Sequence, residues 1–138
     1  MEHVKNLAIE YHKKGNNCAE TVFKACNEGL NLGLPKSAVR MAAVMGGGIG
    51  RSGCACGALT SACLILGALS GREEPQDKPV VDMYSSVHEF YERWIQRFGV
   101  ACCRILKNPP EGKPVSCAAL MVETADMVSD FVREKGLK

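Results

Sequence analysis

The sequence lacks an excess of either charge, and it lacks a hydrophobic run long enough to cross a membrane. Its 138 residues include 17 Lys and Arg against 15 Asp and Glu, so the formal net charge is only +2. This balance gives no electrostatic reason to bind nucleic acid or a membrane surface. The longest apolar run, residues 62–69, is less than half of the ~20 residues that a membrane-spanning helix needs. We expect neither a nucleic-acid partner nor membrane insertion.

A secretory signal is also missing from the start of the chain. Glu2, His3 and Lys5 stand where such a signal would need an uninterrupted apolar stretch. We therefore expect a cytoplasmic protein. The composition, with 46% hydrophobic and 23% charged residues, is typical of a globular chain, and the length fits one domain over residues 1–138.

The usual signatures of hydrolytic, nucleotide-binding and disulfide-exchange sites are absent from the sequence. It contains no HExxH motif, no GxxxxGK phosphate loop, no CxxC pair and no Ser-His-Asp arrangement. Residues 48–53 satisfy GxGxxG, but a helix-like segment precedes them where a dinucleotide site requires a strand. The histidines, His3, His12 and His88, show no metal-ligand spacing. Hydrolytic chemistry is therefore not supported.

No segment shows the alternating pattern of a β-strand, whereas apolar residues recur at helical spacing along most of the chain. We predict an all-α, single-domain bundle of about six helices. Asn17 and Ser116 are expected to cap two of them, because their side chains accept hydrogen bonds from helix-start amides. The helices are expected over residues 4–15, 17–30, 37–45, 56–70, 80–98 and 117–134, with a short element around residues 101–106.

Five glycines interrupt the chain over residues 46–53, so this segment is expected to form a loop. The following segment is apolar nearly all round, which predicts a helix buried in the middle of the domain. Farther on, a stripe at helical spacing is predicted to form a main wall of the core. It consists of Val80, Tyr84, Val87, Tyr91, Trp94 and Phe98.

Eight cysteines are many for a cytoplasmic chain, where thiols stay reduced and structural disulfides are rare. Metal binding or redox chemistry explains them better, although several are expected to be small core residues. Cys18 and Cys117 each follow a predicted cap, and Cys56 opens the apolar helix. Because free amides and the helix dipole favour a thiolate at a helix start, these three are candidates for chemistry.

The cysteines and their neighbours resemble those of the C_GCAxxG_C_C family of redox-active proteins, which is named after its cysteine pattern. The resemblance covers essentially the whole chain. Its residues are Asn17-Cys18-Ala19, Gly46 to Arg51, Cys56-Gly57-Ala58-Leu59-Thr60, Phe98-Gly99, Cys103-Arg104 and Cys117. The chain departs from the pattern at Ser61, where the CGAxxG motif has its second glycine.

The resemblance implies four functional cysteines, which are Cys18, Cys56, Cys103 and Cys117, and a redox role with an iron–sulfur cluster. A related domain in split-Soret cytochromes favours electron transfer. Cys54 and Cys102 stand beside two of the four and are alternates to them.

Helix geometry separates the remaining cysteines from this set. Cys26 and Cys63 each lie two turns, roughly 10 Å, beyond a candidate cysteine on the same helix, so both are interpreted as core thiols. Cys102 and Cys103 are adjacent, and at most one of them is expected to bind a metal. The backbone of Gly47, Gly48 and Gly50 is expected to approach a cluster closely and to tune it as a second layer of contacts.

We therefore predict a redox protein in which four thiolates hold an iron–sulfur cluster for electron transfer or redox sensing. A thiol–disulfide oxidoreductase is an alternative. A structural zinc protein is another, less favoured because zinc modules usually carry paired cysteines two to four residues apart. A redox partner protein is expected. Its identity and self-association into a homo-oligomer stay open.

Overall fold

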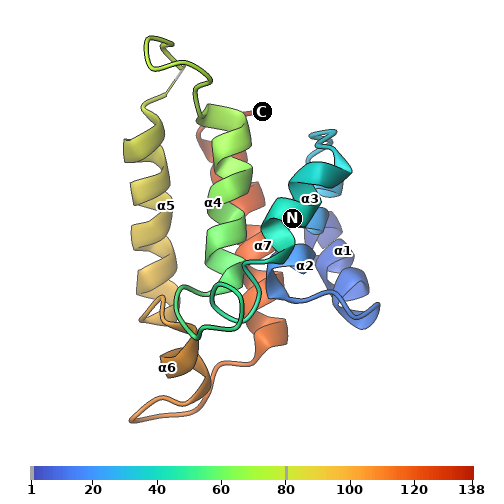
Figure 1. The fold of residues 1–138 in the computed structure, drawn as a ribbon, viewed down its shortest axis with the longest axis vertical. Helices are drawn as coiled ribbons and strands as arrows, with labels where there is room; N and C mark the ends of the chain where they lie inside the picture. Colours follow the sequence, from blue (N-terminus) through green and yellow to red (C-terminus); the bar gives the residue numbers. More distant parts are fainter. Residues whose placement is uncertain (1, 80) are drawn as a thin grey trace.

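The computed structural model describes residues 2–79 and 81–138, and over these residues the chain is all-α, as the sequence predicts (Figure 1). Six longer helices and one short helix account for the regular structure of this part of the chain. They are α1 (Glu2–Lys13), α2 (Cys18–Gly29), α3 (Lys36–Ala43), α4 (Gly57–Ser70), α5 (Met83–Phe98), α6 (Cys103–Lys107) and α7 (Cys117–Glu134). None of the described helices is long and apolar enough to cross a membrane.

Side-chain caps determine where α2 and α7 begin, and both predicted caps are confirmed. The Asn17 side chain accepts a hydrogen bond from the Glu20 amide at 2.8 Å, and the Glu20 carboxylate accepts one from the Asn17 amide at 2.9 Å. Ser116 Oγ accepts a hydrogen bond from the amide of Ala119 at 3.0 Å. Each such cap contributes about 1 kcal/mol to helix stability and fixes which residue is the first of the helix.

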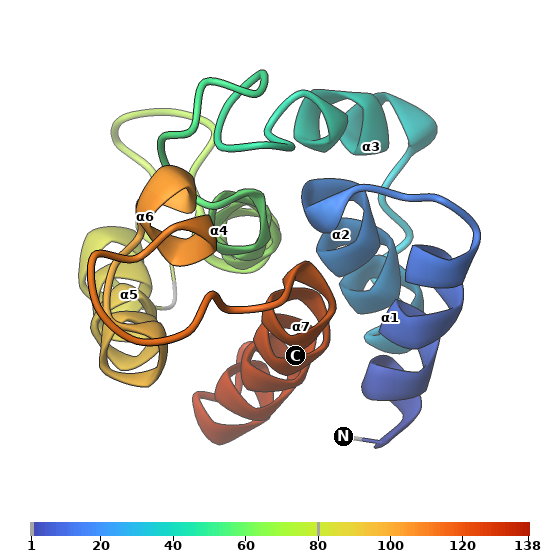
Figure 2. The same cartoon turned by 90° about the horizontal axis from the view of Figure 1, so that it is seen from below.

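Helix α4 lies at the centre of the bundle, with α5 on one side and α2 and α7 on the other (Figure 2). Ala62, Ile65 and Leu66 of α4 are fully buried, and full burial of an Ile or Leu contributes about 1.5–3 kcal/mol. The prediction of a buried central helix therefore holds for most of α4. It is wrong for the outer face, where Leu64 is 39% exposed and Gly67 and Ala68 are exposed.

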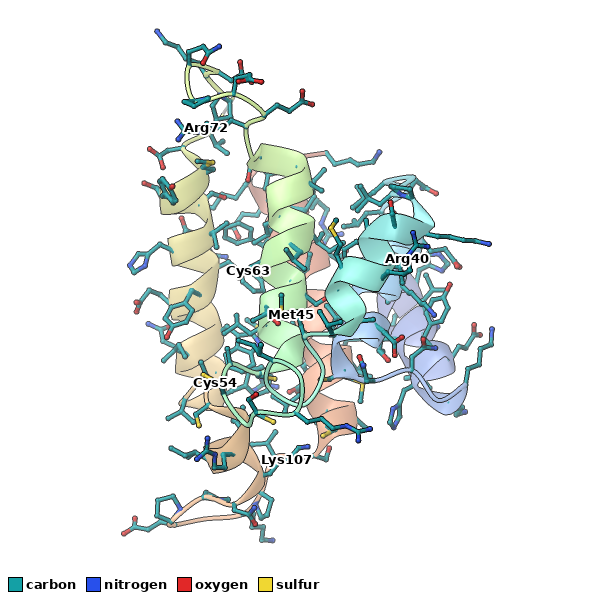
Figure 3. The ribbon with its side chains drawn as sticks, viewed as in Figure 1. Arg40, Met45, Cys54, Cys63, Arg72 and Lys107 are labelled. Carbon is teal, nitrogen blue, oxygen red and sulfur yellow. The ribbon has the colours of Figure 1, made fainter. Side chains whose placement is uncertain are left out.

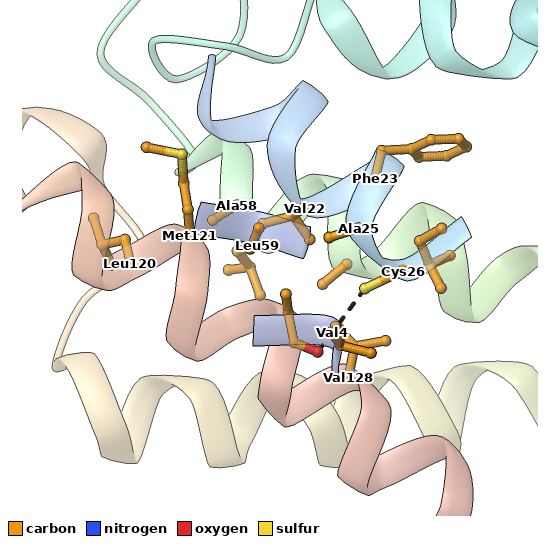
Figure 4. Close-up of a cluster of buried hydrophobic side chains, with 14 of the residues drawn as sticks. Val4, Val22, Phe23, Ala25, Cys26, Ala58, Leu59, Leu120, Met121 and Val128 are labelled. Carbon is orange, nitrogen blue, oxygen red and sulfur yellow. Dashed lines mark hydrogen bonds between the residues drawn. The ribbon is translucent and has the colours of Figure 1, made fainter. Parts of the chain in front are cut away.

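The core between α1, α2, α4 and α7 consists mainly of small and branched side chains (Figure 4). Cys26 lies in its middle with no exposed surface, and its thiol donates to the carbonyl of Ala125 at 3.9 Å. Burial raises the pKa of Cys26 to about 12. The interpretation of Cys26 as a core thiol is confirmed, whereas Cys63 is only half-buried.

The stripe predicted for α5 is confirmed at Val87, Trp94 and Phe98 and is wrong at its two tyrosines. Tyr84 is 75% exposed and Tyr91 is 38% exposed, while Phe90 and Trp94 are buried, and Val80 lies outside the described residues. Phenol groups can stay hydrated at the surface, so the apolar ring of Phe90 takes the inner position instead.

Helix α5 reaches α7 through these two aromatic residues and a surface ion-pair group. The ring of Phe90 meets that of Phe131 edge to face at 5.5 Å, and Trp94 Nε1 donates to Thr124 Oγ1 at 2.9 Å. Outside this contact, Arg93 bridges Glu89 of its own helix and Glu134 of α7. The wall of the core that the sequence predicted at α5 therefore exists. Trp94 is confirmed as part of it, Val87 and Phe98 pack against it, and Phe90 was not predicted.

The starts of α2 and α4 approach each other closely because two positions of α4 carry small residues. An added Cβ at Gly57 would lie 2.6 Å from Cys18 Sγ and 3.3 Å from the Cβ of Ala19. One turn later, the buried Ser61 hydroxyl donates to the carbonyl of Ala19 at 2.8 Å. Ser61 therefore replaces the second glycine of the motif with a satisfied hydroxyl, which a buried site tolerates.

We expect Gly57→Ala and Gly67→Ala to have opposite effects, although both add one methyl group to α4. At Gly57 the new Cβ would also lie 2.9 Å from the carbonyl oxygen of Met45, so overpacking should lower the free energy of unfolding by about 1–3 kcal/mol. At Gly67 nothing lies within 4 Å of the new Cβ. Alanine should therefore raise the free energy of unfolding there by about 0.5–1 kcal/mol. Urea unfolding followed by circular dichroism measures both. Equal stability of the two variants would contradict the close contact.

The raised pKa of Cys26 predicts a loss of stability in alkaline solution. In the unfolded chain the thiol ionises near pH 8.5, whereas the folded chain holds the proton until about pH 12. Between these values the unfolded state binds fewer protons, so this thiol lowers the free energy of unfolding by about 1.4 kcal/mol per pH unit. Urea titrations at several alkaline pH values give the free energy of unfolding as a function of pH. In Cys26→Ala this free energy should fall with pH less steeply by this amount, and an unchanged pH dependence would refute the assignment.

Candidate functional site

The glycine-rich segment between α3 and α4 forms a tight loop whose backbone is left-handed over five consecutive residues. From Gly47 to Arg51, φ lies between +57° and +75°, and two of these residues, Ile49 and Arg51, carry side chains. Each of these two non-glycine residues costs about 1–3 kcal/mol of backbone strain. The loop bonds to itself, since the amides of Gly50 and Gly53 donate to the carbonyls of Val44 and Gly47 at 2.8 and 3.0 Å.

The end of this loop pairs with the chain just before α6. Ala55 and Cys102 form an isolated antiparallel bridge, and the amide of Cys56 donates to the carbonyl of Ala101 at 2.7 Å. Next to it, the amide of Cys103 donates to the carbonyl of Cys54. This pairing holds Cys56 and Cys103 close together although α4 and α5 separate them in the sequence.

All four predicted cysteines lie at helix starts. Cys18, Cys103 and Cys117 are the first residues of α2, α6 and α7, and Cys56 is the N-cap residue of α4. The starts of α4, α6 and α7 lie at the same end of the molecule (Figure 1). The helix start at Cys103 was not anticipated from the sequence, because α6 is too short to show a periodic pattern.

A cavity of about 550 Å³ at this end is lined by three of the four cysteines, namely Cys18, Cys103 and Cys117. Cys56 does not line it and is only 3% exposed. It lies close enough to Cys18 and Cys103 for both to raise its pKa through their charge, and Cys103 experiences Cys18 and Cys117 in the same way. The structure therefore brings the four cysteines together at one end of the bundle.

Burial, rather than the helix start, dominates the acidity of the inner thiols. Burial raises the pKa of Cys56 to about 11, although the backbone amides of Ala58 and Leu59 at the start of α4 lower the pKa in part. Burial also raises the pKa of Cys103, against the lowering effect of Lys107. The expectation that a helix start produces a thiolate is therefore wrong for Cys56 in the free protein, and burial acts in the same direction at Cys103.

The glycines of the loop have different neighbours from one another. An added Cβ at Gly48 would lie 2.8 Å from the Cβ of Cys103, so the backbone touches a cysteine there. At Gly47 the nearest atoms belong to Arg51, and at Gly50 nothing lies within 4 Å. At Gly53 the nearest atom is Nε of Arg104, at 2.9 Å. Of the three glycines predicted to lie near the sulfurs, the structure places only Gly48 against a cysteine.

The two alternate cysteines lie beside the cavity but do not line it. Cys54 is exposed, and the half-exposed Cys102 donates its thiol to the carbonyl of Gly53 at 3.4 Å. Cys54 lies on the outside of the loop, and Cys63 lies farther along α4 (Figure 3). All eight cysteines are free thiols. Over residues 2–79 and 81–138, no three His, Cys, Asp or Glu side chains are arranged to hold one metal ion.

The basic residues of the cavity are functional candidates that no pattern in the sequence predicted. Arg51, Arg104, Lys107 and His12 line it together with the three cysteines, and the lining includes no Asp or Glu. Arg51 follows the glycine run and Arg104 follows Cys103 directly, so both arginines are next to residues of the motif in the sequence. Lys107 and His12 carry no such signal, because only the packing of α1 and α6 brings them to the cavity.

The difference in burial predicts unequal reactivity of Cys54 and Cys56, which are two residues apart. In the reduced, folded protein at about pH 8, iodoacetamide should modify the exposed Cys54 and leave Cys56 intact, since the thiolate is the reacting form. Modification of Cys56 should begin only as the pH approaches 11, the pKa of its thiol. Peptide mass mapping over a pH series measures both residues in one sample. Equal rates at about pH 8 would contradict the buried position of Cys56.

Comparison with protein families identifies the group of proteins that shares this arrangement. The family model described as "Putative redox-active protein (C_GCAxxG_C_C)" matches residues 16–131, which include the four cysteines and the glycine loop. Comparison with curated proteins and with solved structures gave no match. The match spans most of the chain, so this protein belongs to the C_GCAxxG_C_C family of redox-active proteins.

Proposed function

We propose that Cys18, Cys56, Cys103 and Cys117 form one redox centre that holds an iron–sulfur cluster for electron transfer or redox sensing. The observation that carries this proposal is the meeting of four helix-start cysteines at one end of the bundle. Four cysteine thiolates are the usual ligands of such clusters. When bound, the cluster would supply one-electron transfer.

The surroundings of the cysteines suit this type of group. The backbone at Gly48 and Gly57 leaves no room for a side chain, so the chain lies against the Cβ of Cys103 and the sulfur of Cys18. The backbone amides of Ala58 and Leu59 at the start of α4 favour the thiolate of Cys56. Amide groups next to a ligating sulfur tune the potential of a cluster.

The acidity of the inner thiols gives the proposed site a pH dependence. Cys56 and Cys103 hold their protons at neutral pH because burial raises their pKa values. A thiol must lose its proton to bind a metal, so loading releases protons and is weaker at lower pH. Lys107 eases the loss at Cys103, because its charge lowers the pKa of that thiol in part.

A thiol–disulfide oxidoreductase is the second candidate, and one observation favours it. Cys18 and Cys117 are half-exposed and line the same cavity, so a disulfide in solution can reach them. The raised pKa values of Cys56 and Cys103 disfavour these two as attacking groups, because the thiolate is the nucleophile. In this second mechanism the attack comes from Cys18 or Cys117.

Protein produced with ample iron and purified without oxygen should be coloured and should contain iron and acid-labile sulfide. Replacing Cys18, Cys56, Cys103 or Cys117 by Ser should remove the colour and most of the iron, because each change removes one thiolate ligand. Cys63→Ser is the matched control, since Cys63 is a half-buried thiol that does not line the cavity. Cys54→Ser tests whether Cys54 takes the place of Cys56.

Visible absorption, metal analysis and circular dichroism on each variant separate loss of the cluster from loss of the fold. A colourless protein without iron or zinc, in which a reversible disulfide forms among the four cysteines, would replace the proposal by the oxidoreductase. Stoichiometric zinc with no redox response would replace it by a structural zinc site. Full iron content in all four serine variants would show that the site lies elsewhere.

A further inference from the structure

The cations of the cysteine cavity have no acidic partner among the described residues, in contrast to three arginines of the surface. Arg93, Arg97 and Arg133 each pair with a carboxylate on the surface. In contrast, neither Arg51 nor Lys107 has a carboxylate within 4.0 Å among the described residues. Arg104 likewise has no such ion pair within that part of the chain, and its guanidinium donates to the carbonyl of Ser52 at 3.2 Å.

The glycine loop holds two of these cations at the cavity. The side chain of Arg51 lies against Gly47, and that of Arg104 lies against Gly53, where a Cβ would meet them at 2.8 and 2.9 Å. Arg51 also has a left-handed backbone with φ +61°. Such strain persists only where surrounding contacts impose it, and it occurs often at ligand-binding sites. The loop therefore directs positive charge toward the thiols of the cavity.

We propose that this cavity binds small anionic thiols and disulfides beside Cys18 and Cys117. Its volume of about 550 Å³ is in the range that small molecules occupy. Arg51, Arg104 and Lys107 line it and supply the charge for carboxylate or phosphate groups. The concave lining favours a small molecule over the flat surface of an acidic protein. The half-exposed thiols of Cys18 and Cys117 favour a ligand that itself carries sulfur.

The reaction of such a ligand is a thiol–disulfide exchange. The thiolate of Cys18 or Cys117 attacks one sulfur of the ligand's disulfide, a protein–ligand disulfide forms, and the ligand's own S–S bond breaks. The other half leaves as a thiolate with the electron pair of the broken bond. This inference goes beyond the proposed cluster, because it concerns the metal-free protein with free thiols, and its test does not depend on metal content.

The test compares two disulfide probes that differ in charge, using reduced, metal-free protein with Cys54→Ser to remove the exposed thiol outside the cavity. The anionic probe is 5,5′-dithiobis(2-nitrobenzoate), and the neutral probe is 4,4′-dithiodipyridine. Stopped-flow absorbance gives the rates, and peptide mass mapping assigns them to Cys18 and Cys117. The ratio of the anionic to the neutral rate in the folded protein is divided by the same ratio in urea-unfolded protein.

At low ionic strength this quotient should be roughly tenfold or more, because three unscreened charges about 7 Å away each contribute about two- to threefold. Arg51→Gln, Arg104→Gln or Lys107→Gln should each lower it about two- to threefold, and about 0.5 M salt should bring it close to one. Arg72→Gln is the matched control, because Arg72 lies at the opposite end of the molecule from Lys107 (Figure 3). It should leave the quotient unchanged.

Binding, as opposed to attraction at a distance, should appear as a rate that levels off as the anionic probe approaches about 1 mM. A quotient near one at low salt would overturn the proposal. An equal loss in Arg72→Gln would also overturn it, because the charge would then act from the whole surface. The rate could also stay linear in probe concentration while the charge effect is present. The cavity would then attract anions through its positive potential without binding them, and this result would also overturn the proposal.

Discussion

The close contact between the starts of α2 and α4 determines where the sulfur atoms of the site lie. Gly57 has no side chain at the point where Cys18 Sγ passes, and the hydroxyl of Ser61 bonds to the carbonyl of Ala19. Two small residues one turn apart are what allow two helices to approach to this distance. With α2 fixed against α4, the bridge between Ala55 and Cys102 adds the start of α6 to the same end. The CGAxxG part of the motif is therefore a packing requirement as much as a chemical one.

Two effects oppose each other at the inner thiols, and their relative size decides whether these thiols are protonated in the metal-free protein. Helix-start amides favour a thiolate at Cys56, but burial disfavours it more strongly, so the pKa rises to about 11. The half-buried Cys18 and Cys117 line the cavity together with Cys103. A site with protonated thiols inside and accessible thiols outside can bind a metal when protons leave, and it can meet a disulfide from solution. Both proposals follow from this gradient of burial.

Local patterns in the sequence predicted the helices, because the caps Asn17 and Ser116 and the 3.6-residue spacing act within one or two turns. The same spacing failed to choose between Phe90 and Tyr91 for the inner face of α5, since both lie three or four residues from Val87 and from Trp94, and both spacings fall on one face of a helix. The meeting of the four cysteines was expected from the family resemblance alone. No local signal could bring Lys107 and His12 to the cavity, because their proximity depends on how whole helices pack.

The left-handed loop connects the packing to the charge at the site. A run of five residues with positive φ is unfavourable for Ile49 and Arg51, and a loop free to relax would not keep it. Its own hydrogen bonds and the pairing of Gly53 and Cys54 with the start of α6 hold the run in place. The amide of Arg104 donates to the carbonyl of Gly53 at 3.1 Å, so a hydrogen bond joins the end of the loop to the residue of α6 that carries the cation. The strain is thus retained where it fixes both arginines beside the cysteines, which is the arrangement that a site for anions requires.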